Sequence, residues 1–539
     1  MNKVTGGTIV VKALEDLNVD TVFGIPGIHN LDIYDALIHS SIKHVTAKHE
    51  QGVGYMADGY ARVTGKPGIA LVITGPGLTN IITAMGQAYH DSIPMVVISS
   101  QLPTWALNQR IGFLHELKNP TILTQSVAKE SRTVMSLENI DLYIKEAYQL
   151  ALSGRPGPVH VEIPMDILHG YTDRAEIINF KGEDLAKSNF PLIDKALLDL
   201  AVNEINKANF PLIIVGGGGW QAGEKILELA EKISAPVIQT AAGKGIVDEG
   251  HPLCLGTRIH FPVVREFLKT TDLVIAIGTE ISPTDLWEQP LNIGGKLIQI
   301  DIDAANFNRN YRADIGLKGD ALEVLAFLLD KVKTNEETNP NVLKKIADLK
   351  KTTTIKLPET TGVYEGVEFI KEMLAAIRSS LPADGILFTD MTTPAYIGLS
   401  EYPCRQPKTY IHPVGFGTLG FALPAAIGAK IAKSHTKVCV LAGDGGFQFT
   451  LPELAVACQE NISLPIIIWN DGGFGEIRRH QEKRHPGQKI AVNHKNPDFI
   501  KLAEAYSLKG VIVSSPPEMK NVLKEAFLLN EPVIIEVKA

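Results

Sequence analysis

The stretch VCVLAGDGGFQFTLPELAVACQENISLPIIIWND, residues 438–471, decides the fold. Its short apolar runs Val438–Leu441 and Ile466–Trp469 are rich in β-branched residues, which favours buried parallel strands. Leu451–Glu460 lies between them and has the apolar spacing of a helix. A strand, a helix and a second strand in this order predict an α/β domain built on a doubly wound parallel sheet.

Two glycine-rich loops follow these strands, Gly443–Gly446 (GDGG) after the first and Asn470–Gly473 (NDGG) after the second. The carboxyl ends of parallel strands meet at one edge of a sheet, where α/β proteins bind ligands. Carboxylate oxygens suit Mg²⁺, and glycines let backbone N–H groups approach phosphate oxygens. Tight turns alone are the alternative. The 27 residues from Asp444 to Asp471 fit a strand-helix-strand return, so we expect a metal-diphosphate site.

The same alternation of apolar runs and amphipathic stretches continues along all 539 residues, a length that exceeds one ordinary hydrophobic core. We predict three α/β domains of similar size at 1–172, 190–335 and 360–539, each a doubly wound parallel sheet. The polar stretches at 171–192 and 333–362 are interpreted as linkers.

The composition excludes several classes of function. A net charge of −8 argues against a broad nucleic-acid surface. The four cysteines form no CxxC pair, which argues against a zinc site or a disulfide framework and favours a reducing compartment. The N-terminal residues lack the apolar core of a signal peptide, and no run of about 18 apolar residues predicts a membrane span. We therefore expect a cytoplasmic enzyme.

Two further motifs come before the Asp444 and Asp471 loops in the chain. Near the N-terminus, Ile42–Ala47 has the pattern of a strand, and Glu50 opens a helix within HEQGVGYMADGYAR, residues 49–62. The simplest interpretation of Glu50 is a favourable acid in a first helical turn. Further along, Gly415–Gly420 (GFGTLG) precedes a helix expected at Ala422–Ala432.

Together with the Asp444 and Asp471 loops, these motifs resemble the superfamily of thiamine-diphosphate-dependent acetolactate synthases and 2-oxo acid decarboxylases, over nearly the whole chain. The resemblance implies pyrimidine-binding, middle Rossmann-like and diphosphate-binding domains in that order, with thiamine diphosphate and Mg²⁺ as cofactors. Asp444, Asp471 and the carbonyl of Gly473 would hold the metal, with Asp471 in place of the second Asn usual in the family. In similar enzymes the paired domains come from two subunits, which implies a homodimer or homotetramer with shared active sites.

The resemblance also implies roles at the cofactor rings. Glu50 would protonate the aminopyrimidine ring, whose imine nitrogen then removes the C2 proton to give a carbanion. Leu419 would wedge the two rings together, and the carbonyl of Gly417 would accept the cofactor's amino hydrogen bond. The residues expected to contact the cofactor are Gly24, Pro26, Gly27, Glu50, Thr74, Thr392, Thr393, Gly417, Leu419, Gly443, Asp444, Gly445, Gly446, Asp471, Gly473, Phe474, Gly475, Glu476 and Ile477.

The resemblance leaves the reaction open. The activated cofactor attacks a small 2-oxo acid and releases carbon dioxide, after which the enamine can be protonated, joined to a second oxo acid or oxidised. The turn Gly216–Gly219 after the strand Leu212–Val215 could serve FAD or another nucleotide, but we favour a tight turn. The nearby stretches GTRIH (256–260) and GTE (278–280) depart from the flavin segments of acetolactate synthases, so FAD is not expected. A dehydrogenase or regulatory protein built on this turn would leave Glu50 unexplained.

The substrate side favours protonation of the enamine, which gives an aldehyde. Residues 114–116 (LHE) replace the Phe-Gln-Glu segment of acetolactate synthases, and Glu476 and His480 stand where that family has an apolar residue and a Trp. The runs GFLHE (112–116) and IDIDAANFN (300–308) resemble the branch that decarboxylates 5-guanidino-2-oxopentanoate.

Acidic partners would suit the guanidinium of such a substrate. The candidates are Glu116, Glu280, Asp285 and Glu476, each of which could instead be a surface or structural acid. We predict non-oxidative decarboxylation of a 2-oxo acid, with Glu50, His115 and Glu476 as catalytic residues. Acetolactate synthesis from pyruvate is the alternative.

Overall fold

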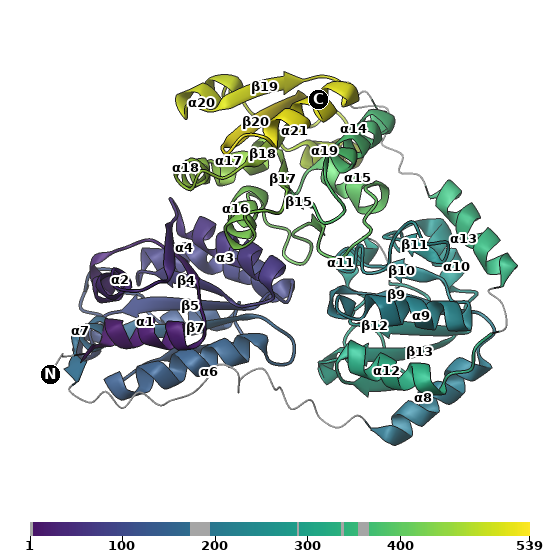
Figure 1. The fold of residues 1–539 in the computed structure, drawn as a ribbon, viewed down its shortest axis with the longest axis horizontal. Coiled ribbons are helices and arrows are strands. Elements are labelled where there is room, and N and C mark those ends of the chain that lie inside the picture. The colour runs from purple at the N-terminus through teal and green to yellow at the C-terminus, as the bar shows by residue number, and fades with distance from the viewer. Residues whose placement is uncertain (1–3, 173–193, 288–289, 336–338, 354–365) are drawn as a thin grey trace.

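The computed structural model describes residues 4–172, 194–287, 290–335, 339–353 and 366–539. Among these residues, three six-stranded parallel sheets with flanking helices form three α/β domains (Figure 1). The predicted fold class, three doubly wound parallel sheets, is confirmed. The predicted linker at 171–192 falls almost entirely on residues 173–193, which lie outside the described part of the chain.

The N-terminal domain contains a sheet of order β3-β2-β4-β5-β7-β6. Every residue of β4, β5 and β7 is buried, as expected for strands covered by helices on both faces. The strands are β2 (Thr21–Gly24), β3 (Lys43–Thr46), β4 (Gly68–Val72), β5 (Met95–Gln101), β6 (Glu130–Thr133) and β7 (Pro158–Pro164), with an antiparallel pair β1 (Val4–Thr5) and β8 (Tyr171–Thr172). The helices are α1 (Gly6–Asp16), α2 (Leu31–Leu37), α3 (Glu50–Thr64), α4 (Pro76–His90), α5 (Pro120–Gln125), α6 (Ile140–Leu152) and α7 (Met165–His169).

The middle domain has the sheet order β11-β10-β9-β12-β13-β14. Its strands are β9 (Pro211–Val215), β10 (Val237–Gln239), β11 (Cys254–Gly256), β12 (Leu273–Ile277), β13 (Lys296–Asp301) and β14 (Ile315–Lys318). Its helices are α8 (Lys195–Lys207), α9 (Gly223–Ile233), α10 (Pro262–Leu268), α11 (Pro283–Leu286) and α12 (Ala321–Lys331). The core between these layers is almost wholly aliphatic, which fits the β-branched runs that predicted the strands.

The C-terminal domain has the sheet order β16-β15-β17-β18-β20-β19. Its neighbouring strands β17 and β18 are the pair predicted from residues 438–471. Its strands are β15 (Ile386–Thr389), β16 (Tyr410–Ile411), β17 (Val438–Gly443), β18 (Leu464–Asn470), β19 (Lys509–Val513) and β20 (Pro532–Lys538). Its helices are α14 (Gly366–Ser380), α15 (Thr393–Glu401), α16 (Ala422–Ala432), α17 (Asp444–Phe449), α18 (Leu454–Gln459), α19 (Gly475–Arg484), α20 (Phe499–Ala505) and α21 (Pro516–Ala526).

Two predicted segments differ from the structure. The stretch at 333–362 was predicted to be a linker, but it contains the 13-residue helix α13 (Pro340–Thr352), whose Ile346 and Leu349 are buried in the core of the middle domain. The prediction was wrong because the Lys and Thr residues around these two positions mask their helical spacing. The glycine-rich loop after β17 is also shorter than expected, because Asp444 itself begins α17.

Within one chain, the N- and C-terminal domains meet along α3 and α16 (Figure 1). A Cβ added at Gly59 of α3 would lie 1.9 Å from the carbonyl oxygen of Ala425, and one added at Gly428 of α16 would lie 1.9 Å from that of Met56. Both positions therefore require glycine, because the two helix backbones touch there. This crossing fixes α3, and with it Glu50, relative to the C-terminal sheet.

Candidate active site

The carboxyl edge of the N-terminal sheet places Glu50 at the first residue of α3, where the sequence predicted a helix start. His49 caps the helix by accepting a hydrogen bond at Nδ1 from the backbone N–H of Gln51 at 3.1 Å. Asn80 of α4 donates from Nδ2 to Glu50 Oε2 at 2.9 Å, which orients the carboxylate. Glu50 is only partly buried, so a ligand at this edge can reach it.

The C-terminal domain contributes a residue to this segment that the sequence did not single out. The carboxylate of Glu453, fully buried, accepts hydrogen bonds from the backbone N–H groups of Lys48 and His49 at 2.9–3.2 Å. Burial raises the pKa of Glu453 to about 7. Gly52 is needed beside it, because a Cβ there would lie 2.3 Å from Glu453 Oε1. Glu453 thus holds the chain just before Glu50 in place from the other domain.

The turns after β2 and β4 reach the same edge as Glu50. Gly24 is the last residue of β2, Pro26 and Gly27 follow it, and Thr74 and Gly75 follow β4. Gly75 has a φ of +69°, and a Cβ on it would lie 2.6 Å from the carbonyl oxygen of residue 115. The loop that carries the predicted histidine therefore lies directly against this turn.

His115 lies at this turn beside a second histidine. Its ring centroid is 5.2 Å from that of His29, and each ring has a buried Nδ1 with no hydrogen-bond partner among the described residues. His115 also has a φ of +69°, an uncommon conformation for a residue with a side chain. Burial, and secondarily the charge of His115, lowers the pKa of His29. A pair of buried, unsatisfied ring nitrogens beside a catalytic edge is a candidate binding position for a polar ligand.

The carboxyl edge of the C-terminal sheet brings Asp444 and Asp471 together, as the loop spacing predicted. Asp444 is 1% exposed, and burial together with the charge of Asp471 raises its pKa to about 6. Two carboxylates placed so closely in a buried setting fit a divalent cation, which would offset their repulsion. Within the described residues, no group of three or more His, Cys, Asp and Glu side chains is arranged to bind a metal. The carbonyl of Gly473, the third ligand that the resemblance implies, would add a backbone oxygen to these two carboxylates.

A side chain from farther along the chain completes this arrangement. Asn496 donates from Nδ2 to Asp444 Oδ2 and to Asn470 Oδ1, which joins the two loops. Gly473 has a φ of +151° and pairs with Asn493, and a Cβ there would lie 2.0 Å from the carbonyl oxygen of Val492. Only glycine fits at this point, so the backbone of 473 is held at the edge where the sequence analysis expected a metal ligand.

Backbone surfaces free of side chains surround Asp444, as a diphosphate requires. A Cβ on Gly443 would lie 3.0 Å from Thr392 Oγ1, and one on Gly446 would lie 3.0 Å from Cγ of Asp390. A Cβ on Gly445 would lie 2.9 Å from Cε1 of Phe474. The helices α15 and α17 both begin here, so their backbone N–H groups are directed toward this edge. The residues present fit a metal-bound diphosphate.

The loop Gly415–Gly420 lies between the two domains. Asp390, fully buried, accepts a hydrogen bond from the N–H of Gly420 at 2.9 Å, and burial raises its pKa to about 6. From the N-terminal domain, Gln87 accepts from the Thr418 hydroxyl at 3.0 Å. These contacts fix the half-buried side chain of Leu419, the predicted wedge.

The four acids considered as partners for a cationic substrate have different surroundings in the structure. Glu280 forms ion pairs with Arg155 and Arg309. Glu476 forms an ion pair with Arg479 of its own helix and lies 3.2 Å from His480 Nε2. Asp285 is partly buried and accepts a hydrogen bond from the N–H of Ala241 at 3.1 Å. These three carboxylates therefore have partners within the protein. Glu116 likewise accepts hydrogen bonds from the N–H groups of Gly112 and Phe113, but it also lines a cavity.

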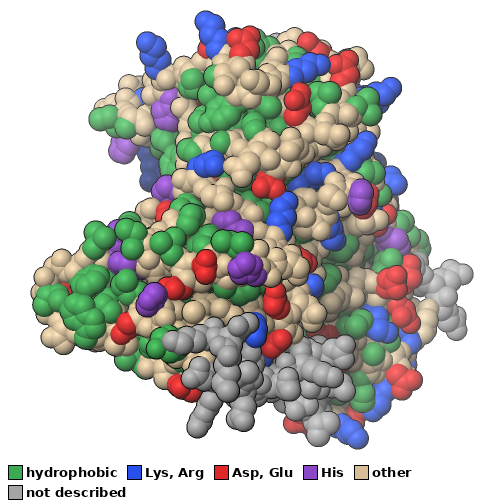
Figure 2. Space-filling view, turned by 60° about the vertical axis from the view of Figure 1, so that its left-hand side comes forward, with side chains coloured by type: hydrophobic (Ala, Val, Ile, Leu, Met, Phe, Trp, Pro, Cys, Tyr) green, Lys and Arg blue, Asp and Glu red, His purple; other side chains and the backbone are tan. Residues whose placement is uncertain are grey.

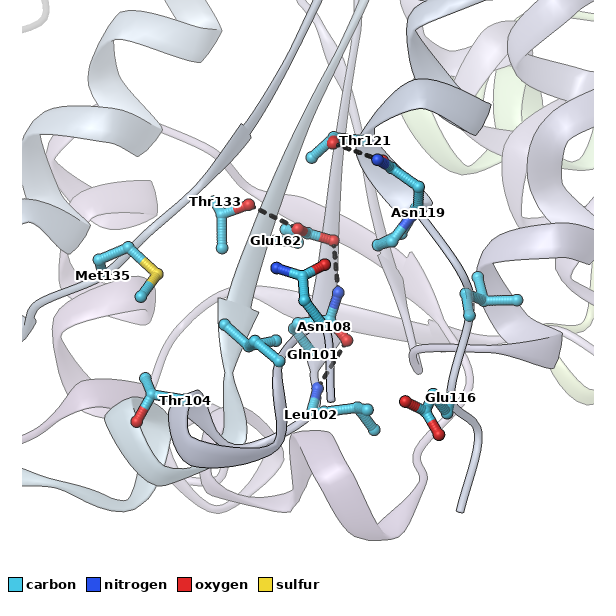
Figure 3. Close-up of a pocket in the computed structure, with 13 residues that line it drawn as sticks. Gln101, Leu102, Thr104, Asn108, Glu116, Asn119, Thr121, Thr133, Met135 and Glu162 are labelled. Carbon is cyan, nitrogen blue, oxygen red and sulfur yellow. Dashed lines mark hydrogen bonds between the residues drawn. The ribbon is translucent and has the colours of Figure 1, made fainter. Parts of the chain in front are cut away.

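That cavity lies at the carboxyl ends of β5, β6 and β7 and has a volume of about 290 Å³ (Figure 3). Glu162 of β7 lies in its wall, 3% exposed. Glu162 could not be identified from the sequence, because a Glu within the run PVHVEIP has no local pattern that marks it as functional.

The turn Gly216–Gly219 packs against the backbone of a neighbouring loop. A Cβ at Gly216 would lie 2.4 Å from the carbonyl oxygen of Gly278, which is also the acceptor for the N–H of Gly218 at 3.0 Å. Glycine is needed here because the two backbones approach each other closely. A tight turn requires glycine for the same reason.

Comparison with known proteins agrees with this geometry. Family models of thiamine pyrophosphate enzymes match all three domains: the N-terminal TPP binding domain at residues 4–122, the central domain at 198–328 and the C-terminal TPP binding domain at 392–537. The chain belongs to the thiamine pyrophosphate enzymes. The predicted superfamily and its cofactor, thiamine diphosphate, are thereby confirmed, whereas Mg²⁺ stays a prediction.

Individual relatives within the thiamine pyrophosphate enzymes cover nearly the whole chain. A probable 2-ketoarginine decarboxylase of Pseudomonas aeruginosa is 37% identical over 99% of this chain and 94% of its own length. A probable acetolactate synthase large subunit of Methanocaldococcus jannaschii is 33% identical over 99% of this chain and 91% of its own. The mitochondrial acetolactate synthase catalytic subunit of Saccharomyces cerevisiae is 32% identical over 99% of this chain and 80% of its own. Among the described residues, no helix has the length and apolar character needed to cross a membrane.

Proposed function

We propose that this thiamine pyrophosphate enzyme decarboxylates a cationic 2-oxo acid, 5-guanidino-2-oxopentanoate, without oxidation and releases the aldehyde. The observation that carries the proposal is the acidic cavity beside His115, which suits a long positively charged substrate. The likeness to a probable 2-ketoarginine decarboxylase supports it. The reaction balances as the 2-oxo acid plus a proton giving carbon dioxide and 4-guanidinobutanal.

Thiamine diphosphate, when bound, supplies a nucleophilic carbon that takes up the electrons released with carbon dioxide. Asp444, Asp471 and the carbonyl of Gly473 would hold Mg²⁺ and through it the diphosphate. Glu50, oriented by Asn80, would exchange a proton with the pyrimidine ring. The wedge Leu419 would press the two cofactor rings together. These residues are the activation machinery that we propose for this chain.

His115 is our candidate for delivering the proton that completes the aldehyde. Its position against Gly75 places it at the same edge as Glu50, and His29 packs against it. Burial, and secondarily the charge of His115, lowers the pKa of His29, so the His29 ring is neutral near pH 7 and is not our candidate for the proton donor. Glu476 pairs with Arg479 and lies beside His480 on its own helix, and its predicted catalytic role stays a prediction.

A second copy of the chain would complete each active site. Exposed hydrophobic side chains are numerous around the catalytic edge of the N-terminal domain, where Figure 2 shows hydrophobic patches among polar ones. They are Ile28, Leu31, Trp105, Ile111, Leu114, Ile122 and Met135. So many exposed apolar residues on one face support coverage by another subunit. We propose a homodimer or homotetramer, and the four free cysteines support a reducing, cytoplasmic setting.

Product analysis tests the proposed reaction. The enzyme, with thiamine diphosphate and Mg²⁺, is incubated separately with 5-guanidino-2-oxopentanoate and with pyruvate, and the aldehydes and 2-acetolactate are quantified. The proposal expects 4-guanidinobutanal as the main product from the guanidino acid. Acetolactate from pyruvate with no aldehyde from the guanidino acid would establish the alternative, a carboligating acetolactate synthase, which the relatives at 33% and 32% identity favour.

A further inference from the structure

The cavity at the carboxyl ends of β5, β6 and β7 is lined by two carboxylates and no cationic group. Its walls consist of Gln101, Leu102, Thr104, Leu107, Asn108, Glu116, Leu117, Asn119, Pro120, Thr121, Thr133, Met135 and Glu162. None of these described lining residues is Lys, Arg or His. At about 290 Å³ the cavity is near the lower end of small-molecule sites, roughly 300 Å³.

Glu162 is the most buried charge in this cavity. Thr133 donates its hydroxyl to Glu162 Oε1 at 2.5 Å, and Gln101 donates from Nε2 to Oε2 at 2.9 Å (Figure 3). Both donors are neutral, and burial raises the pKa of Glu162. A carboxylate removed from water is stable as an anion when a cation pairs with it, and its hydrogen-bond partners here do not supply that charge. The cavity therefore contains no positive charge to balance that of Glu162. A cationic ligand would supply one.

Glu116 adds a second carboxylate from the loop on the other side of the cavity. Its Oε2 accepts hydrogen bonds from the N–H groups of Gly112 at 2.8 Å and Phe113 at 3.2 Å, which fixes its direction. In Figure 3 Glu116 and Glu162 come from different walls of the same space. Two carboxylates on separate walls can accept the several N–H donors that a planar guanidinium directs outward.

Hydrogen bonds link the wall of the cavity to the catalytic edge. Thr74, at the end of β4, donates its hydroxyl to Gln101 Oε1 at 3.4 Å, and Gln101 in turn donates to Glu162. His115 touches the turn at Gly75, while its neighbour Glu116 lines the cavity. The sheet order β4-β5-β7 separates Thr74 from Glu162 by two strand spacings, or roughly 10 Å. A substrate whose charge lies several bonds from its reacting carbon would span this separation.

We propose that this cavity binds the guanidinium end of the substrate, with Glu162 as its charge partner and Glu116 as a second acceptor. The inference rests on the proposed function and adds to it the residues that select the cationic chain. It also gives a role to the polar groups around Glu162. Gln101 and Thr133 hold the carboxylate in position by neutral hydrogen bonds and leave its charge to be balanced by the ligand.

Charge selectivity tests the assignment. Glu162→Gln keeps the size of the side chain and removes its charge. Decarboxylation of 5-guanidino-2-oxopentanoate is compared with that of the neutral, nearly isosteric 5-ureido-2-oxopentanoate, and the ratio of their kcat/KM values is measured for each enzyme. In the wild type this ratio should favour the guanidino acid, and in Glu162→Gln it should fall by about a hundredfold, mostly through KM. Glu280→Gln, a matched change at an acid already paired with Arg155 and Arg309, should leave the ratio unchanged.

A binding measurement complements the kinetics. Isothermal titration of the holoenzyme with 4-guanidinobutanoate should give a dissociation constant about a hundredfold weaker for Glu162→Gln, with butanoate as the neutral-tail control. If the wild type forms 4-guanidinobutanal but Glu162→Gln keeps the wild-type ratio and affinity, the subsite is overturned while the proposed function stands. If the wild type forms no aldehyde from the guanidino acid, both fail. If Glu162→Gln does not fold, Glu116→Gln, expected to lower the same ratio by about tenfold, provides the decisive comparison.

Discussion

Replacing Glu453 with Gln should change how the stability of the protein depends on pH. The buried carboxyl has a pKa raised to about 7 from its usual 4.5, because burial disfavours the anion. Between these two pH values the native state keeps this proton while the unfolded chain releases it, so the free energy of unfolding falls as pH rises through this window. The difference between the two pKa values corresponds to a loss of roughly 3 kcal/mol, complete above pH 7.

The amide that Glu453→Gln introduces would be neutral at every pH and would not lose this contribution. At low pH the protonated Glu453 and the amide each keep one carbonyl oxygen that accepts from the N–H groups of Lys48 and His49, so the two proteins should have similar stability. At about pH 8 the free energy of unfolding of Glu453→Gln should exceed that of the wild type by roughly 3 kcal/mol. Denaturant titration of the cofactor-free proteins, followed by circular dichroism at about pH 4.5 and about pH 8, measures both differences.

The matched control is Glu368→Gln on α14, where the carboxylate is exposed and pairs with Lys371. Its effect on stability should change little between the two pH values. If Glu453→Gln differs from the wild type by the same amount at both pH values, the reasoning about the buried carboxyl is refuted.

Three further changes test the site. Glu50→Gln should bind thiamine diphosphate yet slow deuterium exchange at its C2 carbon by at least a factor of about a hundred, and near-normal exchange in an NMR time course would reassign the relay. Asn496→Ala should raise the Mg²⁺ concentration needed for cofactor binding by about 10- to 100-fold, because it frees Asp444 to move; a titration with unchanged midpoint would contradict this. Gly428→Ala should lower the free energy of unfolding by about 1–3 kcal/mol, since its methyl group would overlap the carbonyl of Met56, and thermal unfolding with an unshifted midpoint would count against the tight crossing.

The sequence predicted those parts of the fold that local patterns determine. The β-branched runs marked the buried strands, and Glu50 was placed at a helix start that the structure also has. Asp444 and Asp471 were expected together because each follows a strand, and the carboxyl ends of neighbouring parallel strands share an edge. These inferences need only the nearest-neighbour geometry of strands and helices.

The remaining parts of the site depend on contacts between residues far apart in the chain. Glu453 reaches the N–H of Lys48 across 405 positions, and Asn496 reaches Asp444 across 52. Glu162 lies in an apolar strand and His29 in the short 3-10 helix Ile28–Asn30, and neither has a neighbour in sequence that suggests a ligand. Helix α13 was missed for another reason. Its buried residues have helical spacing, but abundant Lys and Thr residues hid it.

The glycine contacts between α3 and α16 have a consequence for attempts to redesign this enzyme. Gly59 lies nine residues beyond Glu50 on one straight helix, a distance of about 14 Å. A small tilt at the crossing would therefore displace the carboxylate at the far end of the helix, so substitutions there would resemble catalytic defects although they touch no substrate. Mutant libraries aimed at new substrates should keep this crossing invariant and vary the walls around Glu116 and Glu162, which line the cavity that we propose for the charged end of the substrate.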